Sequence, residues 1–190
     1  MPKLYSFAGP LLVLVLALSF GSARGEIGSQ DNPKYNSSIN PKYNSSINPN
    51  YNSSINPKYN TSINPKYNTS INPDYSTAIN PDYNTSINPT YNISINPTYK
   101  PSLSPEYGSW SGYYLFDLDA EPIGIVVFAN SDNLLVFSPS MEWIGNLIGN
   151  SEGGFNWFSL ENDWIAFAAK NSEGGYNIFT QDGEWIAFMD

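Results

Sequence analysis

The chain has 190 residues, with 17 acidic and 8 basic side chains and neither histidine nor cysteine. The two missing residue types exclude a Ser-His-Asp triad, a thiol nucleophile, a disulfide framework and the usual zinc or iron–sulfur sites. A formal net charge of −9 argues against a nucleic-acid partner, which would need a basic surface. We therefore expect no enzyme, cofactor or metal centre, and we look for function in the architecture.

Residues 1–25 have the pattern of a secretory signal peptide. The chain begins with Met-Pro-Lys, continues through the apolar stretch Leu11–Phe20, and reaches small residues at Ala23 and Gly25. A charged start, a short apolar segment and a small-residue exit are typical of a cleaved leader. An uncleaved membrane anchor is the alternative, but a span needs roughly 20 apolar residues. We expect a secreted or extracellular-surface protein without a membrane span in the mature chain.

After a short leader over residues 26–32, an octapeptide array occupies residues 33–108. Proline recurs at every eighth position from Pro33 to Pro105, and the typical unit reads I-N-P-K-Y-N-S/T-S. Each unit offers one Ile and one Tyr, so the array alone cannot bury enough apolar area to offset its chain entropy. Proline also favours extended backbone before it. The array therefore predicts an extended or disordered stalk.

The array contains N-x-S/T sequons, the acceptor pattern for N-glycosylation. Seven asparagines stand in this pattern, and all of them lie in the array: Asn36, Asn44, Asn52, Asn60, Asn68, Asn84 and Asn92. We expect a glycosylated stalk, and the alternative is a bare Asn/Ser-rich linker. A short repeat sheathed by sugar resembles the repeat-peptide glycofibril proteins. Self-association through the stalk is one expected contact, and its tyrosines are solvated spacers or contact sites between stalks.

Residues 109–190 have a second, 21-residue period and a different composition. Phenylalanine recurs at 116, 137, 158 and 179, and tryptophan recurs at 143, 164 and 185. Each copy has an aromatic and β-branched run, a polar turn such as Asp182-Gly183, and a second run, which is the pattern of a β-hairpin. We predict an all-β domain of four hairpins in a closed, pseudo-fourfold arrangement, because closure leaves few free edges. The Phe and Trp columns should form its core.

The repeated F-x(5)-W-I-G/A pattern resembles the four-fold β-flower domain, a bacterial domain of four hairpins around an axis. Pro122 replaces the tryptophan in the first copy. The resemblance implies a fold and an exported setting, and it carries no activity that could be transferred.

Acidic side chains in the hairpin repeats have two interpretations. One repeat position is always acidic, and closure would bring its members into a ring: Glu121, Glu142, Asp163 and Glu184. Oxygen ligands suit Ca²⁺, but the repeats lack the loop spacing of known calcium sites, so we favour solvation of the domain surface. Asp117 and Asp119 could in principle do glycosidase work, but nothing in the sequence positions them for it.

Tryptophans outside the 21-residue column are the best candidates for ligand stacking, namely Trp110 and Trp157. The preferred function is an exported, non-enzymatic structural or interaction protein, in which a repeat stalk carries a small β domain that caps, anchors or docks. Its expected partners are copies of itself, surface glycans or other extracellular proteins. The alternative is a carbohydrate- or cell-wall-binding module on a flexible linker.

Overall fold

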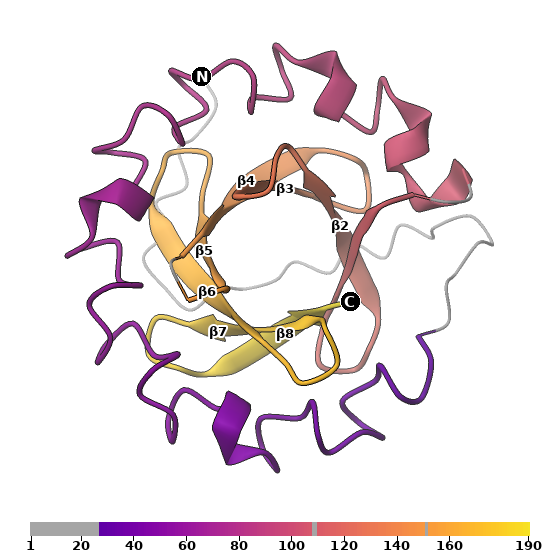
Figure 1. The fold of residues 1–190 in the computed structure, drawn as a ribbon. Helices are drawn as coiled ribbons and strands as arrows, with labels where there is room; N and C mark the ends of the chain where they lie inside the picture. Colours follow the sequence, from indigo (N-terminus) through magenta and orange to yellow (C-terminus); the bar gives the residue numbers. More distant parts are fainter. Residues whose placement is uncertain (1–26, 108–109, 151) are drawn as a thin grey trace, which may run out of the picture.

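The computed structural model describes residues 27–107, 110–150 and 152–190, so the expected signal peptide lies outside the described residues. Eight strands form a closed antiparallel barrel in chain order. They are β1 (Gly112–Phe116), β2 (Pro122–Phe128), β3 (Asn133–Phe137), β4 (Trp143–Gly149), β5 (Phe155–Phe158), β6 (Trp164–Lys170), β7 (Tyr176–Thr180) and β8 (Trp185–Met189). β1 pairs with β8 and closes the barrel (Figure 1). The prediction of an all-β domain closed from four hairpins is confirmed.

The 21-residue sequence period is also a geometric period of the hairpins. One residue in each hairpin turn has a positive φ: Ala120 (65°), Met141 (62°), Asn162 (66°) and Gly183 (86°). In each hairpin the strand register also shifts at the last residue pair before this turn. Only glycine adopts a positive φ without steric cost. The sequence therefore shows the turn most directly in the fourth hairpin, at Asp182-Gly183.

Both faces of the barrel wall are buried. The interior cluster draws residues from all eight strands and includes Phe155, Trp157, Tyr176 and Met189. Other side chains on the same strands point outwards, yet they are also buried in two clusters: Ile125, Val127, Leu135 and Phe137 in one, and Phe167, Ala169 and Phe179 in the other. Burial on both faces explains why these strands read as nearly continuous apolar runs.

The predicted Phe and Trp core therefore has a different position. Phe137 and Phe179 lie on the outer face of the barrel wall, and Trp164 and Trp185 are half-buried beside the second outer cluster. Strands alternate their side chains between two faces, and the sequence period alone did not say which face is the interior. The Phe column marks the outer one.

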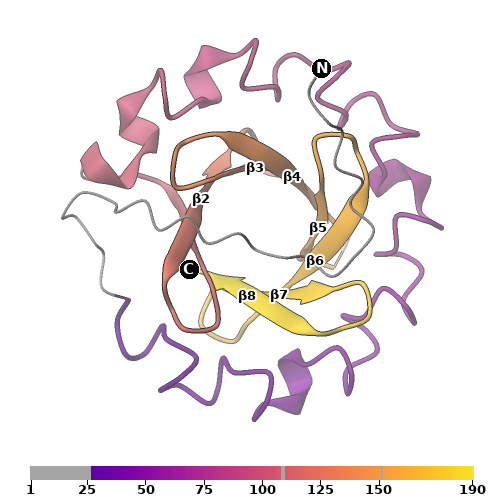
Figure 2. The same ribbon diagram turned by 180° about the vertical axis from the view of Figure 1, so that it is seen from behind.

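The octapeptide array covers this outer face as a ring around the barrel (Figures 1 and 2). We call residues 33–107 the belt. It consists of successive turns and five short 3₁₀ helices: η1 (Ser45–Ile47), η2 (Thr69–Ile71), η3 (Ile93–Ile95), η4 (Pro101–Leu103) and η5 (Pro105–Tyr107). The structure thus differs from the expected extended or disordered stalk.

Isoleucines on the inner side of the belt explain this difference. Ile39 and Ile63 are each 1% exposed, Ile55 packs against the cluster of Phe167 and Phe179, and Ile95 belongs to the other outer cluster. One isoleucine per unit cannot make a core alone. The barrel supplies the missing apolar partner, so belt and barrel bury each other's surface.

Two buried asparagines set the register between belt and barrel. Asn177 Nδ2 donates to the Ile39 carbonyl at 2.9 Å, and Asn156 Nδ2 donates to the Ile63 carbonyl at 2.9 Å. From the first bond to the second, the barrel partner moves back by one hairpin period (177 to 156) and the belt partner moves forward by three octapeptides (39 to 63). Three octapeptides therefore match one hairpin, and the belt circles the barrel in the opposite order to the hairpins.

A second pair of contacts obeys the same relation. Asn50 Nδ2 donates to the Gly183 carbonyl at 3.2 Å, and Thr98 Oγ1 donates to the Met141 carbonyl at 3.4 Å. The belt positions are six octapeptides apart and the barrel positions are two hairpin periods apart, which is again three to one. A full circuit of four hairpins would need twelve octapeptides. The array has ten, so the belt leaves one side of the barrel open (Figure 2).

Replacing Ile63 by alanine tests the belt–barrel contact. We expect Ile63→Ala to lower the free energy of unfolding by about 2–4 kcal/mol, because it leaves a cavity against the barrel wall. Ile93→Ala is the matched control, since Ile93 is 62% exposed and should cost less than about 0.5 kcal/mol. Urea unfolding followed by tryptophan fluorescence measures both. Equal effects of the two substitutions would contradict a folded belt.

Candidate interaction surface

Nine of the ten belt units are hydrogen-bonded turns built around an Asn-Pro pair. In a typical unit the Tyr43 and Asn44 amides both donate to the Asn40 carbonyl at 3.0 Å. Asn40 Oδ1 accepts from the Lys42 amide, and Asn40 Nδ2 donates to the Pro33 carbonyl seven residues earlier, both at 2.9 Å. Proline fits the second position of such a turn because its φ is already fixed there. Each unit is thereby tied to the unit before it.

The sequon asparagines make the second tie between units. Asn44 Nδ2 donates to the Ser38 carbonyl at 2.6 Å, and Asn44 Oδ1 accepts from the Ser46 amide at 3.1 Å and the Ser46 hydroxyl at 2.7 Å. All seven sequon asparagines donate to the carbonyl six residues earlier and accept from the serine two residues later. The N-x-S spacing therefore has a structural reason, independent of sugar.

One unit without a sequon supports this interpretation. Ser76 stands where the other units have asparagine, and Ala78 stands where they have the partner serine. Both side chains of the hydrogen bond are thus missing together. A single loss would leave the remaining polar group without its partner.

A double-mutant cycle on Asn60 and Ser62 tests the structural role of the sequon. Ser62 Oγ donates to Asn60 Oδ1 at 2.6 Å. In unglycosylated protein, Asn60→Ala and Ser62→Ala should each destabilise the fold, with a coupling energy of about 0.5–1.5 kcal/mol between them. Thr61→Ala, at the exposed middle position of the same sequon, is the control and should not couple to Asn60→Ala. A coupling energy of zero for Asn60 and Ser62 would contradict the structural role.

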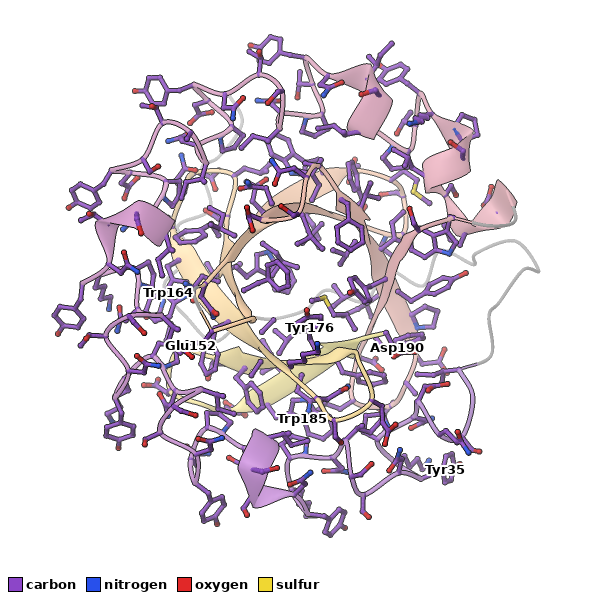
Figure 3. All side chains as sticks on the ribbon, in the orientation of Figure 1. Tyr35, Glu152, Trp164, Tyr176, Trp185 and Asp190 are labelled. Atoms are coloured by element: carbon purple, nitrogen blue, oxygen red, sulfur yellow. The ribbon has the colours of Figure 1, made fainter. Side chains whose placement is uncertain are left out.

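Tyrosines form the outer edge of the belt, and we call them the tyrosine rim. Their exposed fractions run from 64% to 78%: Tyr35, Tyr43, Tyr51, Tyr59, Tyr67, Tyr75, Tyr83, Tyr91 and Tyr99. Figure 3 shows Tyr35 on this rim and Tyr176 inside the barrel. Large aromatic side chains are usually at least partly buried, so a regular series of exposed tyrosines marks this rim as the candidate interaction surface.

The residue before each rim tyrosine varies, and its charge changes from the first part of the belt to the second. Lysines occupy this position in the first part of the belt and acids or threonines in the second, in the order Lys34, Lys42, Asn50, Lys58, Lys66, Asp74, Asp82, Thr90 and Thr98. The Nζ atoms of Lys34, Lys42 and Lys58 lie 5.7–5.9 Å from the ring centroid of the following tyrosine, within the range of a cation–π contact. Total charge alone, which nearly balances over the array, does not show this order.

The acidic repeat position remains on the barrel surface. Glu121, Glu142, Asp163 and Glu184 are exposed, and each carbonyl accepts from the backbone amide four residues earlier in the hairpin turn. No group of three or more acidic side chains within the described residues is arranged to hold a metal ion. Asp117 Oδ1 accepts from the Asp119 and Glu121 amides at 3.0 and 2.9 Å, so its carboxylate orders the first hairpin turn.

The two tryptophans predicted to stack on ligands are not free on the surface. Trp157 is 9% exposed and belongs to the interior cluster of the barrel, so that prediction is wrong for this residue. Its position in the strand alternation places it on the inner face of β5. Trp110 is half-buried, packs on the outer cluster, and meets Tyr114 edge-on with ring centroids 5.2 Å apart.

Asp190 lies where the start of the described chain meets the barrel. Burial, and secondarily the negative charge of Asp31, raises the pKa of the Asp190 carboxyl from its ordinary value of 3.8. The folded state therefore favours the protonated form. Its contribution to stability is fully present below about pH 3.8 and is lost as the pH rises through the raised pKa.

Replacing Asp190 by asparagine should remove this cost. We expect Asp190→Asn to stabilise the protein at pH 7, by less than about 1 kcal/mol because the site is partly solvated, and to have no effect at pH 3. Asp182→Asn, on an exposed turn, is the control and should be neutral at both values. Urea midpoints at the two pH values measure the effect, and an equal gain at both would contradict the assignment.

Comparison with known proteins finds no matching family model, no similar curated protein and no matching solved structure. The closed barrel of hairpins is compatible with the four-fold β-flower fold. Among the helices of the described residues, none has the length and apolarity needed to cross a membrane.

Proposed function

We propose that this protein is an exported, non-enzymatic structural or interaction protein whose belt presents the tyrosine rim to other molecules. The proposal rests on the different roles that the residues of each octapeptide have in the structure. Isoleucine and the Asn-Pro pair are used for packing and hydrogen bonds, while tyrosine is left exposed in the nine units that begin at Pro33 to Pro97. A belt that served packing alone would have no need for nine exposed aromatic side chains.

Multivalent contact fits this arrangement. Tyrosine combines a large apolar face with a hydroxyl and has few rotatable bonds, so it binds with a small loss of side-chain entropy. Nine tyrosines at one spacing would let several weak contacts add up on a repetitive partner. In this proposal the barrel is the scaffold and the belt is the contact surface.

Export and glycosylation belong to the same proposal. We propose cleavage after Gly25 and sugar attachment at the seven sequons, whose asparagines are half-exposed. N-glycosylation replaces one amide hydrogen, and the remaining one can still donate to the carbonyl six residues earlier. Intact mass spectrometry of the natural protein tests both parts. A mass equal to that of the bare chain from Glu26 onwards would refute glycosylation, and a mass that includes the segment before Glu26 would refute cleavage.

We also propose membership of the four-fold β-flower domains for residues 109–190, on the strength of the four hairpins and their repeated F-x(5)-W-I-G/A pattern.

Binding of carbohydrate is the second candidate function. The observation that favours it is the exposed rim itself, because tyrosine faces beside asparagine and serine amides and hydroxyls suit the apolar faces and hydroxyls of sugars. Binding to a panel of insoluble cell-wall polysaccharides separates this candidate from protein contact.

Substitution of the rim tests the proposed function directly. Tyr51, Tyr67 and Tyr83 are replaced by serine in the full chain, expressed in the organism that encodes it, and the share retained in the extracellular matrix or cell-wall fraction is measured. We expect retention to fall at least fivefold without loss of thermal stability. The matched control replaces the same three residues by phenylalanine and should retain the protein. Unchanged retention of the serine variant would overturn the proposal.

A further inference from the structure

The end of the barrel that carries the hairpin turns leaves aliphatic side chains in contact with solvent. An isoleucine is the second residue of each of the strands β2, β4, β6 and β8, and all four strands begin at this end: Ile123, Ile144, Ile165 and Ile186. Ile144 is 39% exposed, and the other three are half-buried against the interior cluster. Leu118 and Leu160, in two of the turns, are 45% and 38% exposed. We call these six residues the apolar ring.

The opposite end of the barrel is closed by aromatic side chains. Tyr113 packs against Phe128 and Tyr176, and Tyr176 packs against Phe155, with ring centroids 5.3–5.8 Å apart. Of these four side chains, Phe128 alone is classed as exposed. The exposed large aliphatic side chains of the described barrel residues therefore all lie at the turn end.

Acidic side chains surround the apolar ring. One exposed acid stands two residues before each isoleucine: Glu121, Glu142, Asp163 and Glu184. Three more exposed acids lie in the same turns: Asp119, Glu161 and Asp182. Lys170 is the only basic residue between positions 110 and 190, and it ends β6 at the opposite end of the barrel. The turn end is thus apolar at its centre and negative around it.

The belt does not neutralise this charge. Lys66 Nζ lies 5.7 Å from the Trp164 ring centroid, and Asp82 Oδ2 accepts from Asn162 Nδ2 at 3.1 Å. These two belt side chains bring one charge of each sign to the edge of the turn end. The surplus of acidic side chains there remains.

Charge complementarity indicates what kind of partner fits the turn end. A second copy of this chain, placed turn end to turn end, would bring acidic side chains against acidic side chains, and like charges across an interface are unfavourable. A segment with aliphatic side chains between lysines or arginines matches both the apolar ring and its acidic surroundings. We propose that the turn end is a docking surface for a basic, amphipathic polypeptide segment of another protein.

This surface lies on the barrel and goes beyond the proposed role of the tyrosine rim. Burial of the aliphatic side chains supplies affinity, while the charges set the choice of partner and are screened by salt. We expect a dissociation constant of about 10–100 μM for a short segment in about 20 mM NaCl, weakened at least about fivefold in about 0.5 M NaCl.

An NMR titration of the unglycosylated mature chain tests the proposal. The probe is a short synthetic peptide of alternating lysine and leucine, and a peptide of alternating glutamate and leucine is its charge-reversed control. We expect the lysine peptide to shift the amide signals of the four hairpin turns and of the strand residues that follow them. The glutamate peptide should leave these signals unchanged.

Two sets of substitutions separate the apolar from the charged contribution. Leu118→Ser, Ile144→Ser and Leu160→Ser together should weaken binding of the lysine peptide at least about fivefold. Neutralising three turn-end acids (Glu142→Gln, Asp163→Asn and Glu184→Gln) should weaken it at least about tenfold. The matched control neutralises three exposed acids at the opposite end of the barrel (Asp132→Asn, Glu152→Gln and Glu173→Gln) and should keep the affinity within about threefold. Melting temperatures verify that each variant folds.

Several results would overturn the proposal. They are unchanged amide signals at about 1 mM lysine peptide, equal binding of the glutamate peptide, and equal loss in the opposite-end control. Turn-end signals that shift with protein concentration alone would instead assign the surface to a second copy of this chain. The variant with serine at Tyr51, Tyr67 and Tyr83 should bind the peptide like the wild type, so this proposal and that of the tyrosine rim fail separately.

Discussion

Mutual burial of the belt isoleucines and the outer face of the barrel is the contact on which the rest of the structure depends. The barrel wall has a second apolar face, and Phe137 and Phe179 on that face are 0% and 1% exposed. The belt has one isoleucine per unit and no core of its own. Each Å² of apolar surface removed from water contributes about 25 cal/mol to stability. Belt and barrel gain this free energy only from each other, because neither can bury its own apolar surface. The three-to-one ratio of units to hairpins follows from this contact.

Hydrogen bonding explains why the belt can be so regular without helix or sheet. A backbone that lies against an apolar wall must satisfy its amides and carbonyls locally. In the seven units with a sequon, the two asparagines do this by reaching carbonyls six and seven residues earlier, as Asn44 and Asn40 do. Asn156 and Asn177 then donate their own amides to belt carbonyls. The same network that fixes the inner side leaves tyrosine and its neighbour on the rim.

The sequence predicted the barrel better than the belt. The 21-residue period, the Asp182-Gly183 turn and the aromatic runs are local signals, and they predicted four hairpins in a closed arrangement. The belt has no such local signal, since the partner of Ile63 lies in strands that follow it by more than ninety residues. The N-x-S spacing fits either N-glycosylation or a structural hydrogen bond. The side-chain bond between Asn60 and Ser62 shows the second of these. Trp157 was misplaced because its face of the strand depends on which side is the interior.

A compact belt and an extended stalk differ most in overall size, which small-angle X-ray scattering of the unglycosylated mature chain measures directly. For about 165 residues (190 − 25), a compact protein has a radius of gyration of roughly 15 Å, and a ring-shaped belt raises it by a few ångströms. An extended belt would add a stalk on the order of 200 Å at about 3.1 Å per residue. We predict a radius of gyration below about 20 Å and a largest dimension below about 70 Å. A largest dimension beyond about 150 Å would contradict the account.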